Sequence, residues 1–298
     1  MLTKTRGILL IMIAAVCFGL LPLFATIAYA NGFNPITLTL FRFGFGAGLL
    51  YTYIRIKGIN YRVSKWQFFM LFQAGLIGYG LMMLILVASY NYIPTGLATT
   101  LHFVYPIAIM IGSIFIFKEA VDWKSITALI FSVVGIYFLT GFNSLQSLNI
   151  FGVSLALVSG VLYAYYVLTI ARSSLREVSA FVIAFYISFF NTLILLVVCA
   201  FTGDLQLNIT YTGFLSILSL SLISGFVGMV AFHAGLKIIQ ATTASILSTF
   251  ELITSLLVGV FLLAEVLAWY HILGSMLIIF SVITVTFSEK KAFPLDSP

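Results

Sequence analysis

Charged residues are scarce in this sequence, and that scarcity excludes most soluble proteins. Asp, Glu, Lys and Arg make up 7% of the 298 residues, whereas about a quarter is usual in a soluble domain. Hydrophobic residues make up 62%, and the mean hydropathy is +1.19. One core of this size cannot bury so much apolar surface, so part of it must face lipid. The sequence therefore predicts an all-α integral membrane protein with the lipid bilayer as its partner, and excludes a soluble enzyme.

Cysteine is almost absent as well. Cys17 and Cys199 each lie inside an apolar run and are interpreted as packing residues, so no disulfide framework is expected. The three histidines, His102, His233 and His271, are too far apart in sequence to match a metal-binding spacing. The sequence also lacks a phosphate loop, a nucleotide-binding motif and a nucleophile motif. We therefore expect no metal, no cofactor, no enzymatic activity and no ATP hydrolysis.

The net charge of +6 does not indicate a nucleic-acid partner, because the basic residues lie between apolar segments instead of forming a stripe. A transmembrane helix needs about 20 apolar residues, and ten segments of the chain qualify. Turn-forming residues such as Asn, Gly and Pro separate several of them. The segments are 7–30, 35–54, 67–90, 95–117, 124–141, 149–170, 178–201, 211–236, 241–263 and 268–288.

Lys and Arg fall on one set of segment ends. Of the 14 basic residues, all but Arg42 lie at these ends, and the opposite loops contain none. Positively charged loops tend to stay in the cytoplasm, so this pattern predicts that both termini are cytoplasmic. The residues at these ends are Lys4, Arg6, Arg55, Lys57, Arg62, Lys65, Lys118, Lys124, Arg172, Arg176, Lys237, Lys290 and Lys291.

The two halves of the chain resemble each other. From Ala88 onward they align without gaps at a shift of 146 residues, which pairs Glu119 with Glu265. Near the front, Phe18 pairs with Tyr163 at a shift of 145. We therefore predict two five-helix repeats, 1–146 and 147–298. Because five is odd, the second repeat enters the membrane from the opposite side.

Inverted repeats of this kind are typical of transporters that work by alternating access. Two equivalent halves can exchange shapes, so that the inward-open and outward-open states are near mirror images. A non-transporting membrane receptor and a channel remain alternatives, although a channel does not need the mirror relation. An embedded enzyme would need a cluster of His and acidic residues at one depth, and too few are present.

The chain resembles the ten-helix EamA-type permeases of the drug/metabolite transporter superfamily over nearly its whole length. Several short patterns in this order carry the resemblance: 14–19 in the first helix, 40–43 in the second, 105–106 and 117–119 in the fourth, and 250–251 and 263–265 in the ninth. The resemblance implies a pocket between helices 1, 3, 4, 6, 8 and 9, with helices 5 and 10 more peripheral. It implies no single substrate, because the family moves amino acids, purines, vitamins and amines. Where the family often has Glu-Pro, this chain has Glu251-Leu252.

Glu251 is the first candidate for a functional residue. It lies about midway along the ninth segment, where a carboxylate is costly unless it is paired, hydrated or protonated. We expect it to carry a proton or to bind a cationic group of the substrate. The structural alternative is a neutral acid that bonds a helix carbonyl.

His102 and Tyr105 share one face of the fourth segment, because they are three residues apart. In the repeat they correspond to Ser248 and Glu251. Equivalent helices thus carry polar residues at matching positions, which predicts one central substrate site. A packing role for His102 is an equal alternative.

Other substrate-binding candidates are aromatic or polar residues on the first, third, sixth and eighth segments. Phe18 and Tyr163 are repeat-equivalent and are expected to line the pocket, as is Tyr79, whereas most other aromatics are interpreted as packing. His233 lies near the cytoplasmic end of its segment and either contributes to the site or anchors at the interface.

Arg42 is the one basic residue inside a predicted helix. It can bind a substrate carboxylate, but we favour a structural role in which it clamps a neighbouring helix. Structural or gating roles are also expected for Pro106, Glu119 and Glu265.

The sequence as a whole therefore predicts a secondary active transporter of a small organic metabolite such as an amino acid or an amine. Family resemblance favours export, and Glu251 suggests proton coupling. A facilitative uniporter or channel-like permease is the main alternative. We expect a bacterial inner membrane location, and either a monomer or a homodimer.

Overall fold

The computed structural model describes residues 2–93, 95–118, 121–141, 149–172, 174–207, 209–264 and 266–291. Within these ranges the chain is helical and contains no strand, which confirms the all-α class. The elements are α1 Leu2–Gly19, α2 Leu21–Ala30, α3 Pro35–Ile56, α4 Lys65–Gln73, η1 Ala74–Leu81, α5 Met82–Ser89, α6 Thr95–His102, α7 Tyr105–Phe117, α8 Trp123–Ile136, η2 Tyr137–Gly141, α9 Ile150–Arg172, η3 Ser174–Glu177, α10 Ala180–Thr202, α11 Tyr211–Leu220, η4 Ser221–Gly228, α12 Met229–Leu236, α13 Ala241–Ser248, α14 Phe250–Leu262 and α15 Trp269–Lys291.

Eight helical stretches in the described ranges are long and apolar enough to cross a membrane. A shorter apolar helix covers Trp123–Leu139, and α3 is 22 residues long but contains Arg42. Helix thus occupies each of the ten segments identified in the sequence, whereas the number of crossings and the side of the termini stay predictions. The eight stretches are Thr3–Ala30, Lys65–Ser89, Leu97–Phe117, Ile150–Ala171, Ala180–Thr202, Tyr211–Leu236, Ala241–Leu262 and Trp269–Phe287.

Local sequence explains where several helices begin. The side chain of Asn34 accepts a hydrogen bond from Thr37 N at 2.7 Å, and Pro35 occupies the first turn of α3. Ser64 and Gln67 form a reciprocal capping box at the start of α4. Asp122 caps α8 by accepting from Ser125 N at 2.9 Å. Each cap satisfies backbone N–H groups that have no partner within the helix.

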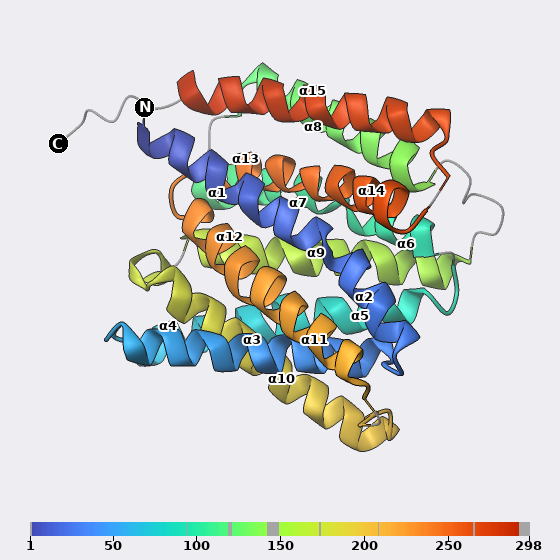
Figure 1. The fold of residues 1–298 in the computed structure, drawn as a ribbon. Helices are drawn as coiled ribbons and strands as arrows, with labels where there is room; N and C mark the ends of the chain where they lie inside the picture. The colour runs from blue at the N-terminus through green and yellow to red at the C-terminus, as the bar shows by residue number, and fades with distance from the viewer. Residues whose placement is uncertain are drawn as a thin grey trace.

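The helices form one bundle in which α8 and α15 pack together at an edge (Figure 1). Two glycines permit this contact, because a Cβ on Gly135 would lie 2.8 Å from the Gly274 carbonyl oxygen. The other edge is formed by α10, and α9 passes through the middle (Figure 1). The first helices of the two halves, α1 and α9, run in opposite directions in this view. The peripheral position of α8 and α15 agrees with the expectation for helices 5 and 10.

Two helices are interrupted at equivalent positions of the repeat. The break between α6 and α7 falls at Phe103 and Val104, and the break between α13 and α14 falls at Thr249, which is 146 residues after Phe103. Pro106 lies in the first turn of α7, whereas α14 has no proline there. In the second half, hydroxyl groups bond back to the preceding turn instead: Thr249 Oγ1 donates to Ile246 O at 2.6 Å and Ser248 Oγ to Ala244 O at 2.8 Å. Such bonds bend helices, so the break does not require the proline.

Two π-helical segments, η1 and η4, occur in the third and eighth segments. Segment η4 packs closely on α3, because a Cβ on Gly46 would lie 3.5 Å from the Cα of Gly225. One turn before Gly46 on α3 is Arg42, which is thereby held next to η4. π-Bulges in α-helices are often found at functional sites, and here both adjoin the central cavity.

Candidate functional site

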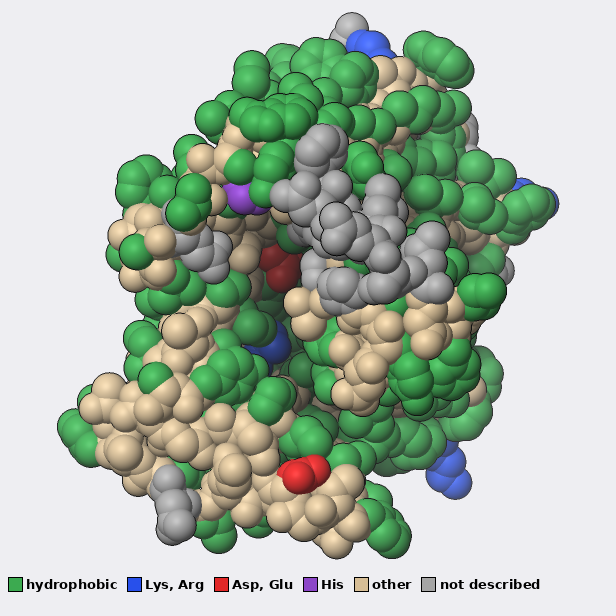
Figure 2. Space-filling view, turned by 90° about the vertical axis from the view of Figure 1, so that its right-hand side faces the viewer, with side chains coloured by type: hydrophobic (Ala, Val, Ile, Leu, Met, Phe, Trp, Pro, Cys, Tyr) green, Lys and Arg blue, Asp and Glu red, His purple; other side chains and the backbone are tan. Residues whose placement is uncertain are grey.

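A cavity of about 390 Å³ lies between the two halves. Figure 2 shows a hollow in the end of the molecule that carries the loops after α2, α5, α10 and α14, with an acidic and a basic side chain inside it. The charge pattern of the sequence predicts that this end faces the outside. The lining residues are Phe18, Leu21, Pro22, Arg42, Tyr79, Met82, Met83, Leu86, Tyr90, Thr99, His102, Phe103, Tyr105, Tyr163, Tyr166, Met229, Phe232, Glu251, Leu252 and Ser255.

Aromatic rings form most of the inner wall. The ring of Tyr163 lies 4.7 Å from that of Tyr105, and the ring of Tyr79 lies 5.2 Å from that of Tyr166. On another side, Phe18 and Phe232 are 6.5 Å apart. These edge-to-face and tilted arrangements hold the rings rigidly and present both π faces and hydroxyl groups to a ligand.

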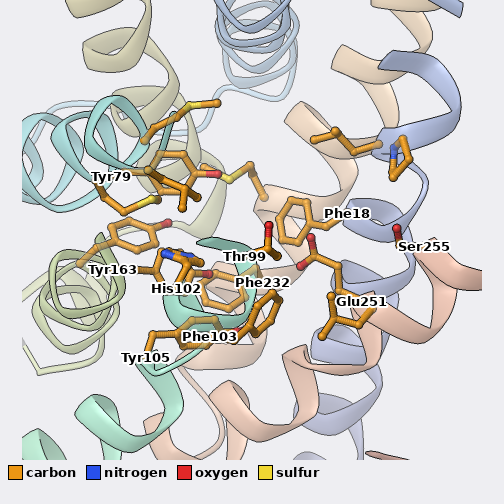
Figure 3. A pocket seen from close by; sticks show the side chains of 18 of the residues that line it. Phe18, Tyr79, Thr99, His102, Phe103, Tyr105, Tyr163, Phe232, Glu251 and Ser255 are labelled. Atoms are coloured by element: carbon orange, nitrogen blue, oxygen red, sulfur yellow. The ribbon is translucent and has the colours of Figure 1, made fainter. Parts of the chain in front are cut away.

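Glu251 reaches into the cavity from α14. Figure 3 shows its carboxylate beside Phe18, with Tyr79, Tyr163 and His102 on the opposite side. The residue is half-buried and lies in the first turn of α14, directly after the break at Thr249. The N–H groups at a helix start carry partial positive charge, which favours a carboxylate there. The break therefore places an acid at mid-helix depth with a helix N-terminus behind it.

The first helix is fitted closely against this break. A Cβ on Gly19 would lie 2.7 Å from the Glu251 carbonyl oxygen and 2.4 Å from Thr254 Cβ. In the other half, a Cβ on Gly160 of α9 would lie 2.5 Å from the His102 carbonyl oxygen. Each half thus uses a glycine to bring a neighbouring helix against the interrupted one, and no larger side chain fits at either position without movement.

His102 contributes an acceptor to the cavity. Its Nδ1 lies 2.9 Å from Ser159 Oγ, and that hydroxyl donates its proton to Ala156 O at 2.6 Å. The hydroxyl must therefore accept from Nδ1–H, which leaves Nε2 as the acceptor in the neutral ring. This orientation gives the cavity a polar group on the wall formed by α6.

Arg42 lines the cavity, although the sequence favoured a purely structural role for it. Its side chain is buried, with 4% exposed, and it donates to Ser224 Oγ on η4 at 2.6 Å. Among the described residues its Nε has no hydrogen-bond partner, and its charge interacts with that of Glu251. This hydrogen bond connects α3 to a neighbouring helical segment, and a structural role for Arg42 stays a prediction.

Three of the remaining candidates, Ser248, His233 and Pro106, lie outside the cavity. Ser248 is buried in α13, and His233 is fully buried behind the wall, where its Nε2 lies 2.5 Å from the hydroxyl of Tyr166. Pro106 is buried in the first turn of α7 and is not part of the lining. Glu119 and Glu265 lie outside the described residues. Of the predicted substrate-binding set, six residues meet in one place: Phe18, Tyr79, His102, Tyr105, Tyr163 and Glu251.

Several lining residues were not predicted as site residues. Tyr166 was interpreted as packing, and Thr99, Tyr90 and the methionines were not assigned to the pocket. Two of the missed residues, Met82 and Met229, are related to each other. Each follows a π-helical segment, and they occupy similar places in the two halves. Within the described residues no group of three His, Cys, Asp or Glu side chains is placed to hold a metal ion. The arrangement offers charge, hydroxyl and aromatic contacts to an organic ligand.

The sequence matches the EamA-like transporter family twice, over residues 5–141 and over residues 150–287. An uncharacterized transporter of Archaeoglobus fulgidus is 26% identical over 269 residues, which are 88% of this chain and 92% of that protein. An uncharacterized transporter of Synechocystis sp. is 30% identical over 220 residues, which are 70% of this chain and 64% of that protein.

The fold is also similar to that of a solved protein crystal structure. The TM-score is 0.83, with coverage of 96% of this chain and 98% of the other, at 15% sequence identity. At this identity the likeness shows a shared fold and no more.

Proposed function

This chain belongs to the EamA-like transporter family and is a multi-pass membrane protein, and on that premise we propose that it is a secondary active transporter of a small organic metabolite. It works by alternating access between its two inverted repeats. The observation that carries the proposal is a cavity at mid-helix depth, lined by aromatic rings and two charged side chains, that opens at the end of the bundle shown in Figure 2. A one-sided cavity is what one state of such a cycle requires.

Tight packing supports closure of the opposite end. All residues of α13 are buried, from Ala241 to Ser248. A Cβ on Gly7 would lie 2.7 Å from Ile239 Cγ2, and a Cβ on Gly235 would lie 2.8 Å from Ile11 side-chain atoms. Close contact of α1 with α12 and α13 leaves no room for a solute, so the described conformation corresponds to an outward-facing state.

The size and chemistry of the cavity support a small organic substrate. Its volume of about 390 Å³ falls within the usual range for small-molecule sites, roughly 300–1,000 Å³. Aromatic faces next to one carboxylate attract an ammonium group, through cation–π contacts and through charge. We therefore assign the substrate to the amines, amino acids and related compounds. We also assign the chain to the bacterial inner membrane and, from family resemblance, to export.

Glu251 is the group that we assign to proton coupling. It is the one carboxylate among the lining residues, and a residue that binds either a proton or a cationic substrate couples the two fluxes. The expected exchange is one in which substrate release and protonation alternate at the same oxygen atoms.

Transport by the purified protein in liposomes tests this assignment. Glu251→Gln is expected to abolish uptake driven by a pH gradient while ligand binding stays measurable, because Gln keeps the shape but cannot carry a proton. Glu177→Gln, which changes an exposed carboxylate, is the control and is expected to transport normally. Unaltered concentrative transport in Glu251→Gln would rule out the proton role.

The same liposomes separate the alternatives. Saturable flux that never accumulates substrate against its concentration gradient identifies a facilitative uniporter. Flux without saturation identifies a channel-like permease, and binding without any flux identifies a receptor.

A further inference from the structure

Two opposite charges line the same cavity from different helices. Arg42 comes from α3 in the first half and Glu251 from α14 in the second. Their charges interact, yet the side-chain hydrogen bonds of Arg42 are with Ser224 and Tyr79 and not with the carboxylate. The cavity therefore holds a separated positive and negative group, with space between them.

The guanidinium of Arg42 has unused donor capacity. The side chain is 96% buried, and in the described part of the chain its Nε has no hydrogen-bond partner. A buried donor without a partner costs free energy, and the cost is larger for a charged group. Arg42 also lines the cavity, so a ligand bound there can approach its guanidinium group. A guanidinium fits a carboxylate because its planar fork can donate two parallel hydrogen bonds.

Glu251 presents the complementary half of the site. Its carboxylate lies beside the ring of Phe18 and faces aromatic residues across the cavity (Figure 3). An ammonium group there gains both the charge of the carboxylate and the π faces of the rings.

We propose that the substrate is a compact zwitterion with an apolar body, whose carboxylate binds Arg42 and whose ammonium group binds Glu251. This rests on the proposed transport function and narrows its substrate class. The two lining charges cancel, so a zwitterion leaves the loaded cavity neutral. A purely cationic or anionic ligand would leave one net charge in a poorly hydrated site, which is costly within a membrane.

Matched compounds test the proposal on the purified full-length protein. The panel pairs L-alanine, L-leucine, L-methionine and L-phenylalanine each with its amine, which lacks the carboxylate, and its acid, which lacks the ammonium group. We expect at least one amino acid to raise the melting temperature more than its amine and its acid do, because ligands that bind the folded state stabilise it.

Variants assign the two ends of the ligand. Arg42→Gln is expected to weaken binding of the amino acid by roughly 10- to 100-fold, the range for one hydrogen bond to a charged group, and not to weaken binding of the amine. Glu251→Gln is expected to weaken binding of both the amino acid and the amine. Arg55→Gln is the control, because it changes an exposed arginine on the same helix.

Three results would overturn the proposal. An amine that binds as well as its amino acid removes the need for Arg42. Equal loss of amino acid and amine binding in Arg42→Gln indicates a structural arginine only. The third is a panel in which no amino acid binds while the liposomes transport another compound, and this result leaves the transport function itself standing. Absence of any saturable flux would instead contradict the proposed function.

Discussion

His233 shows the limit of what the sequence predicts about the position of a single residue. Its position near the end of a segment suggested either substrate contact or interface anchoring. The structure instead buries it completely: its Nε2 is bonded to Tyr166, and its Nδ1 has no partner in the part of the chain that the structure describes. Tyr166 is the lining residue, so His233 reaches the cavity only through that hydroxyl. The sequence could not predict this pairing, because the two residues lie on different helices and are 67 positions apart in the chain.

Removing this hydroxyl should destabilise the protein. In Tyr166→Phe, His233 would lose its hydrogen bond inside the bundle, and the expected cost is about 1–3 kcal/mol. The neighbouring Tyr165→Phe is the control, because Tyr165 is 38% exposed, and it should change stability by no more than about 0.5 kcal/mol. Thermal unfolding of both variants in detergent measures the difference. Equal melting temperatures would show that the bond contributes nothing.

Six of the predicted substrate-binding residues do meet in the cavity, and the reason is local. Helical spacing places His102 and Tyr105 on one face, and the repeat relates Phe18 to Tyr163. Arg42 is different. Its position in the cavity depends on the contact between Gly46 and Gly225, which sets how close α3 approaches η4. No spacing within the sequence reveals that contact.

At the scale of elements, the interrupted helices are the main feature that the sequence only partly indicated. Leu252 stands where the family often has proline, so no proline is present there to bend the helix. The break nevertheless occurs at Thr249, where serine and threonine hydroxyls bond back to the preceding turn. Leu252 N bonds to Thr249 O at 3.1 Å, so residue 252 already lies in the first turn of a new helix.

A proline at position 252 should therefore be tolerated. Leu252→Pro removes one hydrogen bond in a first turn, where proline is acceptable, and the expected cost is about 1 kcal/mol. Leu257→Pro, at an exposed position inside α14, should cost about 3 kcal/mol or more because it breaks a helix interior. Melting temperatures of the two variants compare these costs. If Leu252→Pro is the more damaging change, α14 does not start where the structure places it.

At the scale of the whole molecule, the two halves are unequal in exposure although they are similar in sequence. Residues of α13 are all buried, whereas Thr99 on the equivalent α6 is half-buried and lines the cavity. This also explains why Ser248 is absent from the cavity although its counterpart His102 is present. The end of the bundle that holds α13 is closed, so we expect Ser248 to line the cavity only in the opposite state.

Cysteine labelling tests this asymmetry. In a background without Cys17 and Cys199, Thr99→Cys should react with a membrane-impermeant thiol reagent added from outside, and Ser245→Cys should be protected, because Ser245 is 2% exposed. In the inward-facing state Thr99→Cys should become protected from this reagent, and Ser245→Cys should react with reagent added on the cytoplasmic side, since these positions are 146 residues apart and equivalent in the repeat. Labelling of Thr99→Cys from the cytoplasmic side only would contradict the topology.

The sequence by itself determined the membrane environment, the helical class and the position of each helix, because apolar composition and turn residues act locally. It also indicated the repeat and most of the aromatic wall. Only the tertiary structure decided which end of the cavity is open and that Arg42 faces Glu251 across it. These features depend on packing between helices far apart in sequence. Because the two halves are so similar, the open and closed ends differ by only a small packing free energy, and a linear pattern of residues does not reveal it.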